Sequence, residues 1–165
     1  LHDPLLRENF IEQIFVYQRW REVADSPTAA KLVSFHTTHK LLLMGHSEKH
    51  TREMGRLMAQ AGSLDLDLFI ERYQELLMAA MRLKPTVKKH VNVLQHMMGF
   101  FKKLISADEK QELLDVIDQF RNNTVPLIVP VTLINHYIRK YREPYLMQQY
   151  YLNPHPLELK LRNHS

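Results

Sequence analysis

The sequence of 165 residues contains no cysteine. Without thiols the chain can form no disulfide, no thiolate nucleophile, and no iron–sulfur or zinc site with cysteine ligands. Glycine is scarce, with four residues and no glycine-rich stretch, which argues against phosphate-binding loops and against a turn-rich β protein. No apolar run approaches the ~20 residues of a membrane-spanning helix. We therefore expect one soluble domain that is held together by packing alone.

Helix start and stop signals recur about every 20 residues and predict an all-α fold. Asp3-Pro4 and Ser26-Pro27 have the residue types that begin helices, and Ser106 with Glu109 has the spacing of a capping box. We predict a single-domain helical bundle of about seven or eight helices, followed by a proline-containing tail. The expected helices lie at about residues 4–23, 26–45, 47–61, 65–84, 86–105, 106–122, from 124 onward with Pro130 delaying or bending the start, and 144–151.

Charge is distributed unevenly along the chain, although the net charge is only +4. The segment 84–105 carries five cations and no acid, whereas the segment 106–123 carries two cations and five acids. Basic and acidic segments alternate in this way from one end to the other. The pattern predicts one basic surface and one acidic surface, and it does not fit a uniformly basic tail.

The expected helix at 86–105 has a broad apolar arc and a narrow polar arc that contains no carboxylate. Cations and amides without acids are typical of a surface that binds phosphates, and a glycine in such an arc lets a partner approach the backbone closely. The alternative is an ordinary solvated lysine face, although such a face normally includes glutamates for i,i+4 pairing. The polar arc consists of Lys88, Lys89, Asn92, Gln95, His96, Gly99, Lys102 and Lys103.

The helix that begins near residue 124 shows the same asymmetry. Opposite its apolar side lie Thr132, Asn135, His136, Arg139 and Lys140, again without an acid. Two such faces on separate helices predict a shared basic groove. Four tyrosines follow, at positions 141, 145, 150 and 151. They can stack on unpaired bases, or they can fill core and boundary positions, as most tyrosines at this spacing do.

Histidine is abundant, with ten residues. Two pairs, His36 with His39 and His46 with His50, have the helical spacing at which two imidazoles can share a metal. Because neither pair comes with the rest of a ligand set, we predict no metal in this chain. We expect instead buried histidines that bond to backbone or hydroxyl partners, or that face a ligand. No nucleophile triad, paired carboxylate motif or nucleotide fingerprint stands out, so no catalytic residue is assigned.

Short motifs, several of them containing histidine, are spread over nearly the whole chain. They are Phe35-His36, Lys40-Leu41, His46-Ser47, Arg52, Gly55, His90, Asn92-Val93-Leu94, His96, Gly99, Phe101, Arg121, Pro126-Leu127, Pro130, His136-Tyr137 and Tyr151-Leu152-Asn153-Pro154. This set resembles the YbgA-like family, a bacterial domain family of long-unassigned function. We interpret residues 1–165 as a single YbgA-like helical domain.

In that family the domain occurs alone or fused behind a cysteine-rich domain that resembles iron–sulfur desulfidases. For the fused proteins the resemblance implies removal of sulfur from thiolated uracil, notably 4-thiouridine in tRNA, with the helical domain helping to hold the RNA. The 4Fe–4S cluster and the catalytic cysteines would then lie in a fused or partner domain, outside this chain. The opening Leu1 to Phe15 is similar to the join in fused members, which would fit a domain excised from a longer protein.

We predict a cytoplasmic accessory domain that binds RNA, and tRNA in particular, without catalytic activity of its own. Shorter-range contacts to sugar or base would come from Asn92, Gln95 and His96. Phosphates would be neutralised by Lys40, Lys88, Lys89, Lys102, Lys103, Arg139 and Lys140.

Two rival functions remain open from the sequence. One is a small-molecule-binding or catalytic domain, and the other is a structural domain that docks a catalytic partner. An acid-free groove would favour RNA, buried histidines around a cavity would favour the first rival, and an exposed apolar patch would favour the second. The pocket of the first rival would be lined by His36, His46, Ser47, Arg52, His90 and His136.

Overall fold

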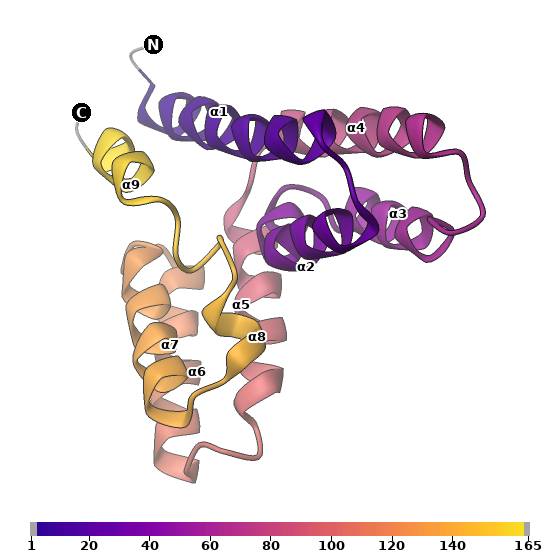
Figure 1. Ribbon diagram of the computed structural model, residues 1–165. Coiled ribbons are helices and arrows are strands. Elements are labelled where there is room, and N and C mark those ends of the chain that lie inside the picture. Colours follow the sequence, from indigo (N-terminus) through magenta and orange to yellow (C-terminus); the bar gives the residue numbers. More distant parts are fainter. Residues whose placement is uncertain (1–2, 164–165) are drawn as a thin grey trace.

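The computed structural model describes residues 3–163, which form nine α-helices and no strand (Figure 1). The predicted all-α bundle is therefore confirmed. None of the helices in the described part of the chain is long and apolar enough to cross a bilayer. The helices are α1 (Pro4–Asp25), α2 (Ala29–His46), α3 (Glu48–Ala59), α4 (Leu66–Arg82), α5 (Val87–Phe101), α6 (Ala107–Arg121), α7 (Ile128–Tyr141), α8 (Pro144–Met147) and α9 (Pro156–Asn163).

Most helices begin at the capping residues that the sequence offers. The capping box at the start of α6 is present, and α7 begins late, with Pro130 in its first turn, as the sequence predicts. The start of α2 differs from the prediction, because the side chain of Thr28 accepts the N–H of Lys31 at 3.1 Å, while Ser26 ends α1. Two predicted helices are shorter than expected: α5 ends at residue 101 and α8 at residue 147.

The proline-containing tail forms α9, a helix that the sequence pattern does not predict. Pro156 occupies its first position, where the N–H that proline lacks would have no partner within the helix. The N–H of Leu157 donates to Nδ1 of His155 at 3.1 Å and so replaces a conventional cap. This helix brings the total to nine within residues 3–163, above the expected seven or eight.

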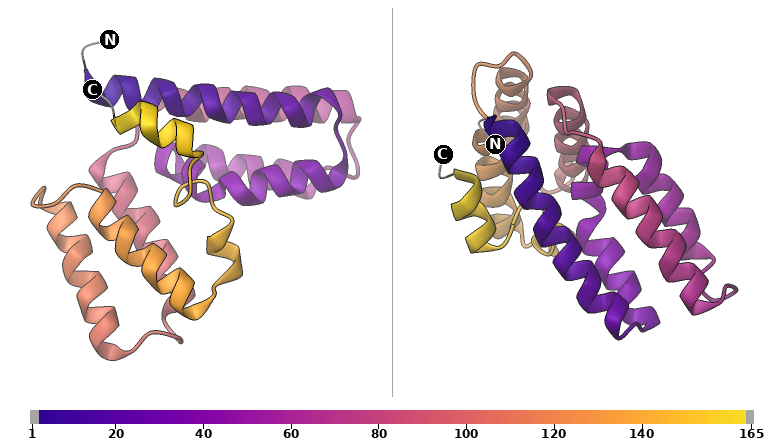
Figure 2. Two further views of the ribbon diagram at one scale, coloured as in Figure 1. Left: turned by 60° about the vertical axis from the view of Figure 1, so that its left-hand side comes forward. Right: turned by 90° about the horizontal axis from the view of Figure 1, so that it is seen from above.

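The helices form two packed groups that cross each other (Figure 1 and Figure 2). The first group, α1–α4, encloses a core around Trp20, whose ring stacks on Tyr73 with 4.9 Å between centroids. The second group, α5–α8, encloses a core of its own. Helix α2 belongs to both, because Leu43 is buried in the first core and Leu41 in the second.

After α8 the chain runs back across α2 as residues 148–155, hereafter the return segment. The fully buried side-chain amide of Gln149 holds this segment on α2. Gln149 accepts the backbone N–H of Leu41 at 3.3 Å and donates to the carbonyl of Thr37 at 2.6 Å. These two backbone groups are the i,i+4 partners of an ordinary helix turn, so Gln149 bonds directly to the hydrogen-bond ladder of α2. The N–H of Tyr150 adds a bond of 3.1 Å to the carbonyl of Thr38.

This return path brings the two ends of the described chain together. Helix α9 packs along α1, with the beginning of α1 and the end of α9 on the same side of the molecule (Figure 2). Side chains more than 140 residues apart, such as Glu12 and Arg162, therefore approach each other.

We predict that Gln149→Ala destabilises the protein by about 2–3 kcal/mol, because it removes two buried hydrogen bonds to the backbone of α2 and opens a cavity. Urea unfolding at neutral pH measures the difference. The matched control is Gln148→Ala, which removes the same groups from an exposed neighbour and should change stability by less than about 0.5 kcal/mol. Equal unfolding midpoints for the two variants would show that Gln149 does not hold the return segment.

Candidate functional site

Helix α5 carries a strip of exposed polar side chains on the side opposite its buried residues. Val91, Leu94 and Met97 are buried in the second core and so fix the rotation of the helix. This strip has three exposed lysines, and none of them forms an ion pair with another described side chain. The exposed strip, hereafter the α5 strip, consists of Lys88, Asn92, Gln95, His96, Gly99, Lys102 and Lys103.

Lys89 belongs to the predicted polar arc, but its side chain bonds to backbone carbonyls of the protein itself. Its ammonium donates to the carbonyl of His46 at 2.7 Å and to the carbonyl of Lys84 at 2.9 Å. It therefore satisfies the C-terminal end of α2, where helix carbonyls lack partners. A role for Lys89 in binding phosphate would compete with these two bonds.

The α5 strip contains no acidic residue, but Glu48 from another helix lies beside it. Asn92 donates to Oε2 of Glu48, at the start of α3, at 3.3 Å. The other oxygen of Glu48 forms an ion pair with Arg52 at 3.0 Å. One carboxylate thus lies beside the middle of the strip, and one cation already partly neutralises it.

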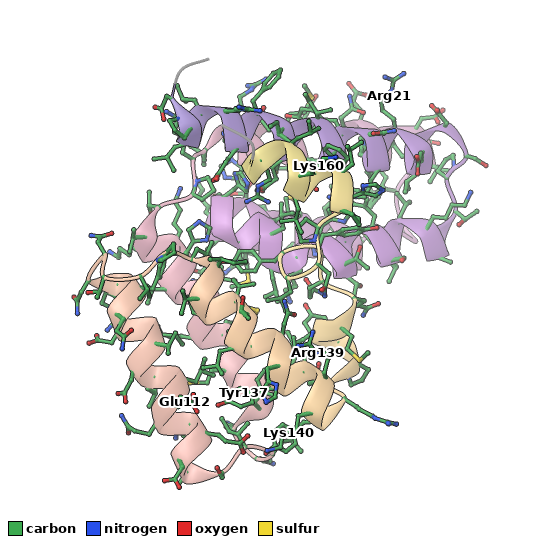
Figure 3. All side chains as sticks on the ribbon, turned by 90° about the vertical axis from the view of Figure 1, so that its left-hand side faces the viewer. Arg21, Glu112, Tyr137, Arg139, Lys140 and Lys160 are labelled. Carbon is green, nitrogen blue, oxygen red and sulfur yellow. The ribbon has the colours of Figure 1, made fainter. Side chains whose placement is uncertain are left out.

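The polar side of α7 has different surroundings from the α5 strip. Lys140 forms an ion pair of 3.1 Å with Glu109 of α6, which also accepts a bond from the Tyr141 hydroxyl. Bonds from Ser106, Tyr141 and Lys140 lower the pKa of Glu109 to about 2, so this carboxylate stays ionised. Figure 3 shows Arg139 and Lys140 on the face where α6 and α7 lie in front.

The short helix α8 contacts both α5 and α7. Tyr145 of α8 stacks on Phe100 of α5, with 4.9 Å between ring centroids, so α8 packs on α5 at the edge of the α5 strip. Asn135 of α7 donates to the carbonyl of Leu152 at 3.2 Å and so faces the return segment. The shared basic groove stays a prediction. Lys40 is exposed on α2, and Arg139 is exposed on α7.

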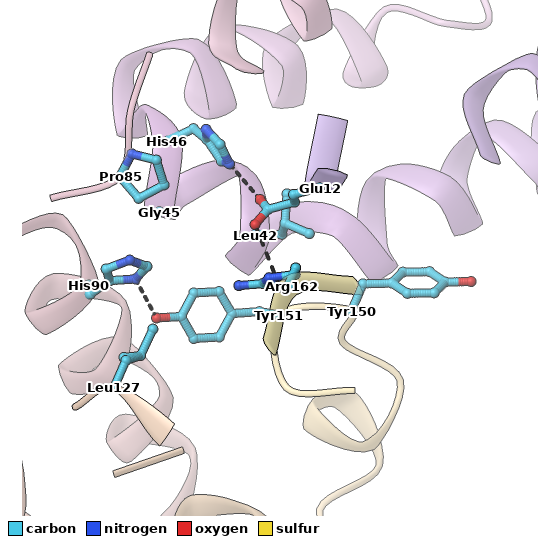
Figure 4. Close-up of a pocket in the computed structure, with 10 residues that line it drawn as sticks. All are labelled: Glu12, Leu42, Gly45, His46, Pro85, His90, Leu127, Tyr150, Tyr151 and Arg162. Atoms are coloured by element: carbon cyan, nitrogen blue, oxygen red, sulfur yellow. Dashed lines mark hydrogen bonds and ion pairs between the residues drawn. The ribbon is translucent and has the colours of Figure 1, made fainter. Parts of the chain in front are cut away.

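A second candidate site is a small cavity between α1, α2, α5 and α9 (Figure 4). The volume of the cavity is about 40 Å³. Since a single water needs ~10–15 Å³ of cavity volume, the cavity has room for a few waters. Polar and charged groups from five segments converge on it. The lining residues are Glu12, Leu42, Gly45, His46, Pro85, His90, Leu127, Tyr150, Tyr151 and Arg162.

Glu12 and His46 form the central pair of this cavity. The Nε2 atom of His46 lies 2.5 Å from Oε1 of Glu12, and Nδ1 lies 2.7 Å from the carbonyl oxygen of Leu83. Because the carbonyl can only accept, Nδ1 carries a proton, and the contact with Glu12 needs a second one. Burial would raise the pKa of Glu12, but the bond to His46 and the charges of His46 and Arg162 lower it overall. The geometry therefore describes a buried pair in which the carboxyl and the imidazole share one proton across a short hydrogen bond.

His90 and Tyr151 form a neutral pair on the opposite wall. Nδ1 of His90 lies 2.7 Å from the hydroxyl of Tyr151. Burial lowers the pKa of His90 to about 4 and raises the pKa of Tyr151, so both side chains are uncharged at neutral pH. The cavity thus joins this proton-sharing pair and a neutral hydrogen-bonded pair.

A further group of charges lies beside the cavity, under α9. Arg19 donates from Nε to Nε2 of His39 at 2.9 Å, and its guanidinium lies 3.9 Å from the centre of the Tyr150 ring. Nδ1 of His39 bonds to the carbonyl of Phe35 at 2.8 Å. Burial and the charge of Arg19 lower the pKa of His39 to about 3, so this ring is neutral. It orients Arg19 toward α9.

Glu158 of α9 faces this group and is only 1% exposed. Its oxygens lie 3.8 Å from Arg19 and 3.6 Å from Arg162, too far for hydrogen bonds, and neither oxygen accepts one from a described group. Burial raises the pKa of Glu158 to about 7, against the pull of Arg162 and Arg19. This carboxyl therefore titrates near neutral pH.

The structure brings only two of the residues predicted for a pocket, His46 and His90, to the cavity. His36 bonds instead to the hydroxyl of Tyr73 at 2.9 Å, between α2 and α4, and burial lowers its pKa to about 4. The other three lie elsewhere: Ser47 caps α3 and contacts His50, Arg52 pairs with Glu48, and His136 is exposed on α7.

The sequence analysis missed the charged residues of the cavity, because they come from the two terminal helices. Glu12 and Arg162 have no motif around them, whereas the other lining residues include four from the motifs named above, His46, His90, Leu127 and Tyr151. In residues 3–163 no three side chains of His, Cys, Asp or Glu gather closely enough to hold a metal ion. The expected absence of a metal stays a prediction.

A family model described as "Protein of unknown function (DUF1722)" matches residues 40–156. The chain belongs to this family. It is also 29% identical over 137 residues to "Uncharacterized protein YbgA" of Escherichia coli (strain K12), over 82% of this chain and 81% of the relative. These matches confirm the resemblance to the YbgA-like family. No solved structure matches the chain. The matched residues 40–156 include the α5 strip, His46 and His90, whereas Glu12, Glu158 and Arg162 lie outside them.

We predict that Glu158→Gln stabilises the protein at neutral and alkaline pH and has little effect near pH 4. The pKa of Glu158 rises from 4.5 to about 7 on folding. Between these values the unfolded chain loses the proton and the folded chain keeps it, so the wild type loses stability, relative to the variant, as pH rises. The full difference above pH ~7 should be at most about 3 kcal/mol.

Urea unfolding at pH 4 to 8 of the wild type and the variant tests this. The buried histidines titrate equally in both proteins, so their effect cancels in the difference. Glu75→Gln, at an exposed position without an ion pair to a described residue, is the control. A stability difference for Glu158→Gln that stays constant across this pH range would contradict the assignment.

Proposed function

We propose that this protein binds RNA, and tRNA in particular, through the α5 strip. The observation that carries the proposal is the exposure of Lys88, Lys102 and Lys103 along one side of α5 without ion pairs to other described side chains. Asn92, Gln95 and His96 lie between them and can bond to ribose or base edges. The strip is roughly 20 Å long, at 1.5 Å per residue, which is enough for several phosphates.

In this proposal the domain is a cytoplasmic accessory that positions thiolated tRNA for an iron–sulfur desulfidase domain or partner. Membership of the DUF1722 family supports the comparison with fused YbgA-like proteins. The sequence has no cysteine, so thiolate ligands for an iron–sulfur cluster do not fit within this chain. The cluster and the chemistry would belong to the partner.

Exposed apolar side chains are compatible with such a partner. Leu5, Phe10 and Ile14 on α1, and Leu157 on α9, are all about half exposed or more. The two helices pack against each other (Figure 2). Exposed apolar side chains can contact a protein partner, and these four lie on helices that do not contribute to the α5 strip.

The cavity favours a small-molecule function less strongly than the α5 strip favours RNA. Two histidines and a carboxylate do converge there, as a pocket function requires. However, ligand pockets usually enclose ~300–1,000 Å³, and this cavity offers about 40 Å³. In this conformation it has room for a few waters or a ligand of similar size, and not for a nucleobase.

We predict that replacing Lys88, Lys102 and Lys103 with Ala lowers the affinity for tRNA and reduces the slope of log affinity against log salt by about 2 to 3. Each lysine that neutralises a phosphate releases condensed counterion when it binds, and its removal lowers the slope by ~1. Filter binding or fluorescence anisotropy at several salt concentrations measures both quantities. Lys89 is left intact, because it caps α2.

The control variant removes three other exposed cations, Arg72, Lys110 and Arg121, and should have little effect. It has the same net charge as the first variant, so general attraction of a basic protein to RNA would weaken equally in both. Equal losses would mean that the α5 strip is not the binding surface. Far-UV circular dichroism verifies that both variants keep their helices.

A further inference from the structure

A pair of aromatic rings lies at the C-terminal end of the α5 strip, with Phe100 exposed and Tyr145 half-buried. Phe100 belongs to the apolar side of the sequence pattern, yet it is 37% exposed. It stacks on Tyr145 of α8, with centroids 4.9 Å apart and 17° between the ring planes. His96, one turn earlier on α5, meets Phe100 edge-on at 6.0 Å. Three aromatic side chains from two helices thus form one cluster at the surface.

The space beside this cluster is open. A side chain at Gly99, next to Phe100, would meet no atom within 4 Å of its Cβ. Glycine within a helix costs about 1 kcal/mol relative to alanine, and here no close packing in the fold requires it. The gap lets a ligand lie directly on the backbone of α5.

The charge around the cluster indicates what kind of ligand fits. Lys102 and Lys103 follow Phe100 in the chain, and both are exposed and free of ion pairs with other described residues. Stacked rings beside free lysines are the combination by which proteins hold single-stranded nucleic acid, with bases on the rings and phosphates on the cations. An apolar protein segment would match the rings but would leave both lysines unpaired.

We propose that the Phe100–Tyr145 pair stacks with an unpaired base of the bound RNA, while Lys102 and Lys103 hold the adjacent phosphates. The proposal rests on the function proposed above and narrows it, because it directs the protein to loops or ends and not to base-paired stems. A duplex buries the faces of its bases, so its bases cannot stack on a protein ring.

The test uses the full chain and two RNA probes with the same number of phosphates, a flexible single strand and a blunt duplex. The wild type should bind the single strand more tightly. Phe100→Leu keeps an apolar side chain against α8 but removes the aromatic face. It should weaken binding of the single strand by roughly 5- to 100-fold, the range for loss of one stacked base, and leave duplex binding and the salt slope unchanged. Tyr145→Phe, which keeps the ring, should behave as the wild type.

A second measurement needs no variant. A 2-aminopurine base in the single strand should lose fluorescence on binding to the wild type, because stacking quenches it. Unchanged fluorescence, or equal binding of both probes by the wild type and Phe100→Leu, would overturn the stacking proposal. The triple lysine variant distinguishes a failure of the stacking proposal from a failure of the proposed RNA binding. If it still loses affinity, RNA binding by the α5 strip stands without stacking, and if it does not, the proposed function itself fails.

Discussion

The side chain of Gln149 is buried against the backbone of α2, and the arrangement of everything that follows α8 depends on it. Its amide offers one acceptor and one donor at the spacing of the Leu41 N–H and the Thr37 carbonyl, so a single side chain satisfies both groups. A hydrophobic residue of the same size would bury as much surface but would lose both of these hydrogen bonds. The bond fixes the chain direction at Tyr150 and Tyr151, and thereby the place where α9 meets α1.

This meeting of the two terminal helices buries several charges, and the fold makes them tolerable in three ways. His46 contacts both the carbonyl of Leu83 and the carboxyl of Glu12, so the buried carboxyl has a hydrogen-bond partner. His39 stays neutral and accepts a bond from Arg19, which orients the guanidinium without adding charge. Glu158, whose oxygens lie beyond hydrogen-bond distance of both arginines, shifts its pKa instead. The group is costly to desolvate, so its main effect is to specify how α9 docks, more than to add stability.

Local patterns in the sequence were sufficient to predict the helices α1 to α8 and, apart from Lys89, the residues of the α5 strip. The buried side of α5 repeats with helical period, so the positions of its lysines on the other side follow from the spacing. Contacts between distant segments carry no such local signal. Nothing near Lys89 indicates that its ammonium binds the end of α2, and nothing near Glu12 indicates an arginine about 150 residues later. Helix α9 was missed because its prolines suggest irregular structure, although proline at a first turn is compatible with a helix.

The distribution of paired and free charges decides which part of the α5 strip attracts phosphate most strongly. The Asn92 side chain contacts Glu48, and Lys88 lies only about 6 Å along the helix from Asn92, at 1.5 Å per residue. Lys102 lies about 15 Å further along, beyond the ~8 Å over which charges interact at physiological ionic strength. The carboxylate therefore weakens the field at one end of the strip and leaves the other end almost unaffected. That other end is where Gly99 leaves open space and where Phe100 is exposed, so charge, access and stacking surface coincide there.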